Sequence, residues 1–304
     1  MFNLDSFLKA KAGLVDSFLE SYFSGARVFP ARFKEAMAYS LNAGGKRIRP
    51  VLALAACEAC GRDPATILPY ACALELIHTY SLIHDDLPAM DDDDLRRGKP
   101  TNHKVYGEAM AILAGDGLLT EAFHILSLPA GGIDPILLLK VIGDVSERAG
   151  LRGMVAGQAQ DILSESGADL PRADLPADME ETIGFIHMHK TAQLITASVR
   201  MGAILAGADE GRLAALTEYG QSVGMAFQVA DDILDVKGET ALMGKTAGSD
   251  QRKAKLTYPA VYGLEASERK ARELVDSALL ALKAFDEKAE PLRAIARFVI
   301  ERKA

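Results

Sequence analysis

The apolar residues of this 304-residue chain recur at spacings of three and four along nearly its whole length. This spacing places apolar side chains on one face of an α-helix, whereas β-strands need strict alternation. Alternating runs joined by Asn-Gly or Asp-Gly turns, which are typical of β-hairpins, are missing. The chain is 49% hydrophobic, which is enough to bury one large core. The sequence therefore predicts an all-α fold.

The helical pattern is interrupted at turn-forming residues, which divide the chain into about a dozen segments. We expect helices over residues 4–20, 32–43, 50–60, 66–87, 107–127, 135–149, 151–163, 178–206 (with a possible kink), 209–237, 256–264, 266–285 and 289–302. No Ser/Pro/Gly-rich or strongly charged stretch is long enough to act as a flexible linker. We therefore expect a single domain over residues 1–304. The long apolar helices at 66–87 and 209–237 should line its middle.

Charge and composition exclude several classes of function. The net charge is -8, from 34 basic and 42 acidic residues, which argues against a nucleic-acid partner or a polybasic membrane anchor. The amino terminus lacks the basic start and apolar run of a signal peptide, and no uninterrupted apolar stretch approaches a membrane span. Cys57, Cys60 and Cys72 are too few for a disulfide framework, which fits a reducing cytoplasm. For the lone Cys57-x-x-Cys60 pair, small buried thiols are a better interpretation than a metal or redox site.

Two clusters of aspartates lie near the carboxyl ends of the two long apolar helices. They comprise Asp85, Asp86, Asp91, Asp92, Asp93 and Asp94, and then Asp231, Asp232 and Asp235. Asp231 and Asp235 share one helical face, about 6 Å apart along the axis. Like charges at this spacing repel, and their apolar surroundings indicate that water does not fully screen the repulsion. A hard divalent cation with oxygen ligands would remove the conflict.

The first cluster contains a proline that should bend it. Pro88 is expected to end the helix, so that Asp91 lies beyond a bend and can turn back toward Asp85. Arg96 and Arg97 follow a few residues later. A diphosphate bridged through magnesium requires such a set, because carboxylates hold the metal, the metal holds phosphate oxygens, and guanidinium groups bind the remaining oxygens.

Each cluster, taken alone, has a simpler alternative. Residues 85–94 would be a solvated acidic loop and residues 231–235 a polar helix face. Two clusters on two long apolar helices favour a shared function instead. Calcium binding of the EF-hand type is disfavoured, because neither cluster has the alternating Asp-x-Asp-x-Asp-Gly loop with its closing Glu.

The residues around both clusters resemble those of the trans-prenyltransferases, or polyprenyl diphosphate synthases. The segment Leu82–Gly98 resembles the first aspartate-rich motif of this family, and Asp231–Asp235, preceded by Gln228, resembles the second. Further agreement comes from Gly44–Pro50, Lys190-Thr191, Gly244-Lys245 and Lys255–Pro259. The sequence is most similar to bacterial farnesyl and plant-type geranylgeranyl diphosphate synthases.

This resemblance implies a single all-α domain of the isoprenoid-synthase type, with a bundle of helices around a central cavity. It implies a magnesium-dependent enzyme that condenses isopentenyl diphosphate with dimethylallyl or geranyl diphosphate and releases pyrophosphate. About three magnesium ions would be held by Asp85, Asp86, Asp91, Asp231, Asp232 and Asp235. The first five of these aspartates, with Lys190 and Lys245, would be the catalytic residues. A homodimer is also implied.

The resemblance further divides the basic and polar residues between two substrates. Arg96, Lys190, Thr191, Gln228 and Lys245 would contact the allylic diphosphate, Lys46, Arg49, His78 and Arg97 would hold isopentenyl diphosphate, and Lys255 would help to close the site. Without the resemblance, the basic run at residues 46–49 suits an anion near a helix start but also an ordinary surface turn. A lone helical histidine such as His78 is usually structural.

Tyr80 and Ser81 bear on the length of the product. Tyr80 lies five residues before Asp85, and in this family an aromatic residue at that position is associated with the fifteen-carbon farnesyl product. Ser81 is small, and much of the surrounding sequence resembles twenty-carbon synthases. We therefore expect farnesyl diphosphate, with geranylgeranyl diphosphate as the alternative; a purely structural Tyr80 would leave the length open.

Two other functions share part of this pattern. A non-catalytic helical regulatory subunit of a synthase would be expected to lose an aspartate motif, and both motifs are present. A class I terpene cyclase usually has a different second metal motif and needs no second diphosphate site.

Overall fold

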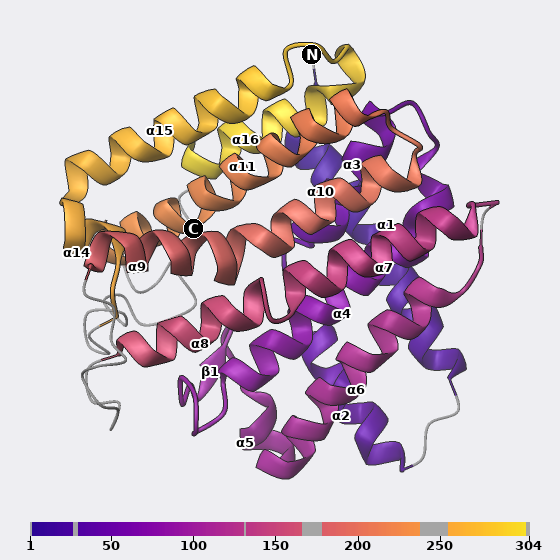
Figure 1. Ribbon diagram of the computed structural model, residues 1–304. Helices are drawn as coiled ribbons and strands as arrows, with labels where there is room; N and C mark the ends of the chain where they lie inside the picture. Colours follow the sequence, from indigo (N-terminus) through magenta and orange to yellow (C-terminus); the bar gives the residue numbers. More distant parts are fainter. Residues whose placement is uncertain (1, 27–29, 131, 166–177, 238–254, 302–304) are drawn as a thin grey trace.

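The computed structural model describes residues 2–26, 30–130, 132–165, 178–237 and 255–301. Within these ranges the chain is an all-α bundle, as predicted, with one small hairpin of β1 (Leu95–Arg96) and β2 (Lys99–Pro100) (Figure 1). The helices in chain order are α1 (Leu4–Gly25), α2 (Ala31–Leu41), α3 (Ile48–Ala59), η1 (Pro64–Ile67), α4 (Leu68–Asp85), α5 (Asn102–Tyr106), α6 (Glu108–Ser127), α7 (Pro135–Ala149), α8 (Met154–Ser164), α9 (Met179–Ile186), η3 (His187–Ala192), α10 (Gln193–Leu205), α11 (Glu210–Lys237), α14 (Tyr258–Tyr262), α15 (Leu264–Ala281), η4 (Glu287–Ala289) and α16 (Glu290–Glu301).

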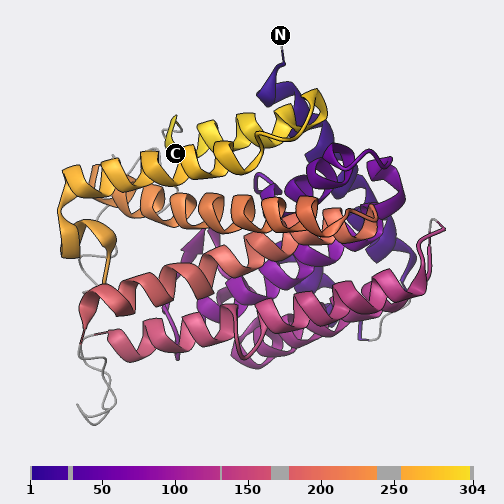
Figure 2. The ribbon, with the colours of Figure 1, turned by 45° about the horizontal axis from the view of Figure 1, so that its top comes forward.

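Two buried apolar clusters hold these helices together and meet at α3 and α10. One joins α4 and α6 to α1, α2 and α7, and the other joins α11 to α15 and α16. Figure 2 shows α15, α11, the α9–α10 helix and the α7–α8 pair as successive rows. The fully buried Tyr70 and Tyr219 donate hydroxyl hydrogen bonds of 2.8 and 2.7 Å to backbone carbonyls, so their burial leaves no polar group unpaired.

Most predicted helices are confirmed, and the differences occur where the local backbone departs from the α-helical repeat. The segment predicted over 178–206 consists of α9, a π-helical turn (η3) and α10 in succession. The helix predicted over 256–264 ends at Tyr262, because Gly263 has a φ of +81° and starts α15. Gly107, with a φ of +87°, separates α6 from the short α5, which the sequence did not reveal.

Two of the described helices, Pro64–Asp85 and Glu108–Ser127, are long and apolar enough to cross a membrane by length and composition alone. Because the finding rests on length and composition only, the expected absence of a membrane span stays a prediction. In the fold, 67% of the apolar window of the first helix is buried inside the protein, so it serves as a core helix. In the second helix only 39% of the apolar window is buried, and the side chains of Ile112 and Leu113 are exposed.

Candidate active site

The first aspartate cluster lies where α4 ends. The backbone N–H of Asp86 still donates to the carbonyl of Leu82, at 3.1 Å, whereas the N–H of Asp91 donates to the carbonyl of Asp85, at 2.8 Å. Pro88, which has no N–H to continue the helix, lies between them. The chain therefore turns back and places Asp91 beside Asp85, as the sequence predicted.

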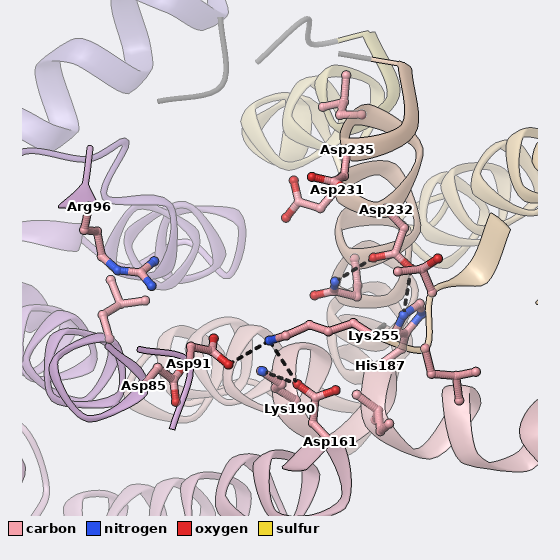
Figure 3. Close-up of a pocket in the computed structure, with 16 residues that line it drawn as sticks. Asp85, Asp91, Arg96, Asp161, His187, Lys190, Asp231, Asp232, Asp235 and Lys255 are labelled. Carbon is pink, nitrogen blue, oxygen red and sulfur yellow. Dashed lines mark hydrogen bonds and ion pairs between the residues drawn. The ribbon is translucent and has the colours of Figure 1, made fainter. Parts of the chain in front are cut away.

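The second cluster lies across a cavity of about 400 Å³ from the first (Figure 3). Asp85 and Asp91 line one wall, and Asp231, Asp232 and Asp235, at the end of α11, line the other. Among the described residues, no three His, Cys, Asp or Glu side chains are grouped closely enough to hold a metal ion by themselves. A cation between the walls would therefore take further oxygen ligands, such as those of a phosphate.

Each of the carboxylates of Asp86 and Asp232 lies close to more than one nitrogen of the protein. Arg96 Nε lies 2.7 and 3.0 Å from the two carboxylate oxygens of Asp86, and its Nη2 lies 2.5 Å from one of them. Asp232 accepts from Gln228 Nε2 at 3.0 Å and from a backbone N–H at 2.8 Å, and it lies 3.1 Å from His187 Nε2. Asp86 therefore orients Arg96, and Asp232 orients Gln228 and His187.

Two lysines compensate part of the acidic charge. Lys255 Nζ lies 2.8 Å from Asp91 Oδ1 and 3.5 Å from Glu165, and Lys190 Nζ lies 2.5 Å from Asp161 Oδ2. Burial opposes the charged form of Lys255, but the carboxylates around it outweigh that effect and raise its pKa. Figure 3 shows the Lys255 ammonium between Asp91 and Asp161.

The carboxyl group of Asp85 lacks full compensation. Burial raises its pKa to about 6, because the lowering effect of Lys190 is smaller than the combined effects of desolvation and of Asp91. A divalent cation at this wall would reverse that shift by favouring the ionised form. The oxygen-only donor set of Asp85, Asp91, Asp231 and Asp235 is the set that magnesium prefers, so the residues fit the metal that the sequence predicted.

A second group of basic residues lies beside the acidic cavity, since Arg49 and His78 line the cavity that adjoins it. Burial lowers the pKa of Arg49 to about 10, with Arg97 adding to the effect, and the buried Nε of Arg49 has no hydrogen-bond partner among the described residues. Burial and the same arginines hold the pKa of His78 well below its usual range. A methyl group at Gly45 would lie 2.5 Å from Arg97 Nη1, so this glycine leaves room for the guanidinium. Lys46 is nearby in sequence, with its Nζ 5.6 Å from the ring centre of Phe298.

Arg47, which the sequence grouped with these cations, points into the core instead. Its Nη1 lies 2.8 Å from Glu75 Oε1, its Nε 2.8 Å from Asp16 Oδ1, and its Nη2 donates to a backbone carbonyl at 2.6 Å. Its own backbone is left-handed, with a φ of +49°. Because of this conformation, the Arg47 side chain points away from those of its neighbours in the sequence. Its contacts with Glu75 and Asp16 anchor the basic segment to α4 and α1.

A second cavity of about 610 Å³ adjoins the first, since Leu82, Asp85 and Lys190 line both. Its lining includes Arg49, His78, Tyr80, Ser81, Met90, Met154, Val155, Ala159, Ile162, Leu163 and Thr191. Most of these side chains are apolar. Tyr80 is 7% exposed, and its ring meets His84 edge-on with 5.6 Å between ring centres.

Most of the predicted site residues that the structure describes line one of these two cavities, but Asp86, Arg97 and Lys46 line neither; Lys245 lies outside the described residues. Arg96, Lys190, Gln228 and Lys255 line the acidic cavity, while Thr191 donates to Gln228 at 2.7 Å. Sequence reasoning missed Gln158, Asp161, Glu165 and His187. The pair Gln158 and Asp161, three residues apart on one face of the otherwise largely apolar α8, was the available signal.

The family model described as polyprenyl synthetase matches residues 30–296. The chain belongs to this family. It is 47% identical to the heterodimeric geranylgeranyl pyrophosphate synthase large subunit 1, chloroplastic, of Arabidopsis thaliana, over 99% of this chain and 80% of that protein. It is 46% identical to a farnesyl diphosphate synthase of Geobacillus stearothermophilus, over 99% and 98%.

The solved structures agree with the family. An FPP/GFPP synthase from Zymomonas mobilis matches with a TM-score of 0.85 and 36% identity, over 98% of this chain and 99% of that one. The fold is therefore that of the isoprenoid synthases, and the chain is a prenyltransferase of isoprenoid biosynthesis. The relatives include both farnesyl and geranylgeranyl synthases, so the family leaves the product open.

Proposed function

We propose that the chain condenses isopentenyl diphosphate head-to-tail with an allylic diphosphate, dimethylallyl or geranyl, and releases pyrophosphate. The observation that carries the proposal is the pair of facing aspartate clusters beside an adjoining, largely apolar cavity, whose lining also includes the basic residues Arg49 and His78. An allylic diphosphate needs carboxylates that bind its metal ions and an apolar cavity for its hydrocarbon chain. A second diphosphate needs basic residues of its own.

Magnesium, about three ions by the family pattern, would be held by Asp85 and Asp91 on one wall and by Asp231 and Asp235 on the other. When bound, it would supply positive charge that stabilises the departing diphosphate. Asp86 and Asp232 would act through their neighbours, Asp86 by holding Arg96 and Asp232 by holding Gln228 and His187. This assignment refines the six-aspartate set implied by the sequence.

The chain's own residues would then guide the reaction. Lys190, Arg96 and Thr191 bind the allylic diphosphate and stabilise its charge as the bond from carbon 1 to oxygen breaks. Arg49, Arg97, His78 and Lys46 hold isopentenyl diphosphate so that its double bond attacks the allylic carbon and a new carbon–carbon bond forms. One proton must then leave carbon 2 of the isopentenyl unit. His78 is a weak base in its cationic surroundings, so the departing diphosphate accepts the proton.

Farnesyl diphosphate is the product that we propose. Tyr80 lines the apolar cavity five residues before Asp85, and its ring is held against His84, which is itself 3.0 Å from the carbonyl of Ile112. A ring supported in this way would stop a chain that grows away from the diphosphate. Geranylgeranyl diphosphate is the alternative, since Ser81 beside it is small.

A cytoplasmic homodimer would suit the surface. The helices α6 and α7, which pack on each other, expose Ile112, Leu113, Ile136 and Leu139 by 43 to 67%. A second copy would cover such side chains. Free thiols at Cys57, Cys60 and Cys72 suit a reducing compartment.

The test is to incubate the purified chain with magnesium, isopentenyl diphosphate and each of the five-, ten- and fifteen-carbon allylic diphosphates, and to measure pyrophosphate release and product length. We expect release with the five- and ten-carbon starters and a fifteen-carbon end product. A twenty-carbon product would refute the role of Tyr80 but not the reaction. No release with any starter would refute the reaction and favour a non-catalytic subunit.

A further inference from the structure

The helix that carries Lys190 and Thr191 contains the π-helical turn η3. Such a turn accommodates an extra residue, bulges from the helix and persists only where its surroundings support it. The two side chains are bound by different neighbouring helices. Lys190 Nζ lies 2.5 Å from Asp161 on α8, and Thr191 Oγ1 donates at 2.7 Å to Gln228 on α11.

Both neighbouring helices meet this turn at a glycine that leaves no spare room. A methyl group at Gly157 of α8 would lie 2.1 Å from the backbone nitrogen of Lys190 and 2.6 Å from its Cα. At Gly224 of α11 it would lie 2.5 Å from the Cα of Ala192. The nearest obstructing atoms are backbone atoms, so no side-chain rotation relieves the overlap.

α8 and α11 contact η3 in the same way. Asp161 is four residues after Gly157, and Gln228 is four residues after Gly224, so on each helix the glycine and the polar residue lie one turn apart on the same face. Each helix thus approaches the backbone of η3 through the glycine and binds one of its side chains through the next turn. At the start of η3, His187 lies 3.1 Å from Asp232, two turns after Gly224.

We propose that Gly157 and Gly224 are positioning residues: together they clamp η3 from both sides and so fix Lys190 and Thr191 in the allylic diphosphate site. The inference rests on the proposed function, which gives these two side chains to that substrate. A larger residue at either glycine would displace the turn by about 1 Å, since ordinary contacts begin near 3.4 Å and the methyl groups would lie at 2.1 and 2.5 Å. Misplacement of about 1 Å can cost roughly 10²-fold in rate.

The experiment compares Gly157→Ala and Gly224→Ala with two matched controls. Gly143→Ala, in α7, adds a methyl group that meets nothing within 4 Å. Gly220→Ala lies one turn from Gly224 on the same helix, but its methyl group would meet Thr196 at 2.9 Å, beyond η3. It therefore reproduces a packing defect between α10 and α11 without touching the turn. If Gly157→Ala does not fold, the comparison of Gly224→Ala with the two controls still tests the proposal.

We expect kcat/KM for the allylic substrate to fall by about 10- to 100-fold in both test variants, with KM for isopentenyl diphosphate within about two-fold of the parent. Gly220→Ala should lose thermal stability but keep the parent's kcat/KM for the allylic substrate. Gly143→Ala, in a helix interior with room for the methyl group, should keep the same kcat/KM and be slightly more stable than the parent. Equal kinetic loss in Gly220→Ala, or allylic kinetics within two-fold of the parent in both test variants, would overturn the inference.

Calorimetric titration with inorganic pyrophosphate and magnesium separates this inference from the proposed reaction. Weaker pyrophosphate binding in the test variants supports the clamp even if the parent protein turns nothing over, in which case only the proposed reaction fails. Unchanged pyrophosphate binding in both test variants would overturn the clamp, whatever the activity of the parent.

Discussion

Glu75 of α4 provides a sharp test of how the basic segment at residues 46–49 is held. Its side chain is 2% exposed and pairs at 2.8 Å with Arg47, which is 4% exposed. Replacing Glu75 by Leu leaves the guanidinium of Arg47 buried with only Asp16, whose side chain is 55% exposed, as its carboxylate partner. The carboxylate of Glu75 also compensates Arg49 and Arg97, so its loss leaves several cations without their counter-charge.

The magnitude follows from this burial. Removing one partner of a buried ion pair typically costs about 3–5 kcal/mol, and the remaining contact with Asp16 places this case near 3 kcal/mol. For a chain of 304 residues, about 3 kcal/mol lowers the melting temperature by roughly 5 °C. The double variant Arg47→Met, Glu75→Leu removes both charges and should recover much of the loss.

The assay is thermal unfolding followed by circular dichroism, with the exposed pair Arg212–Asp209 as the control. Their side chains are 54% and 69% exposed, so Arg212→Ala should change stability by less than about 1 kcal/mol. Glu75→Leu should also raise KM for isopentenyl diphosphate, because Lys46 and Arg49 flank the anchored residue. A melting temperature within 2 °C of the parent, or a double variant as unstable as the sum of its parts, would refute the reasoning.

Three further predictions address the acidic cavity, the product and the thiols. Asp85→Ala and Asp231→Ala should each lower turnover by about 10³-fold or more without altering the far-ultraviolet circular dichroism; full activity in both would reject the metal assignment. Tyr80→Ala should lengthen the main product beyond fifteen carbons by chromatography, and an unchanged fifteen-carbon product would remove Tyr80 from the control of length. Burial raises the pKa of Cys57 to about 12, so at pH 8 its thiolate fraction is about 10⁻⁴, and alkylation should be slow in the folded protein and accelerate as the pH rises. Rapid alkylation of Cys57 at pH 8, mapped by mass spectrometry, would contradict the buried environment.

The features that the sequence predicted well are those set by short-range geometry. The helical repeat located α4 and α11, and Pro88 predicted the bend that returns Asp91 to Asp85. Spacing along α11 also predicted that Asp231 and Asp235 share a face. In each case the relevant residues lie within about two helical turns, where backbone geometry alone determines which side chains are neighbours.

The features that it missed depend on backbone state or on distant partners. Lys46 and Arg47 are adjacent, yet the left-handed backbone of Arg47 sends its side chain into the core, and no local pattern of residue types encodes that turn. Asp161 belongs to the site because α8 packs against η3, which brings its carboxylate to Lys190. Lys255 was expected in the site, but its ion pair with Asp91, 164 positions away in the sequence, was not. Such contacts follow from tertiary packing, which residue periodicity does not specify.

The charge distribution connects these observations. The aspartate walls carry more carboxylates than Lys190 and Lys255 neutralise, and burial shifts Asp85 toward its protonated form. In the adjoining cavity, Arg49 and His78 lie near other basic residues, and burial and repulsion lower the pKa of both. Each half is unfavourable alone, because buried like charges repel in surroundings that water does not screen. A substrate diphosphate with its cations would complete the acidic half, and a second diphosphate would complete the basic half. Binding of both substrates would therefore stabilise the fold, as expected of a site organised for its ligands rather than for the stability of the free protein.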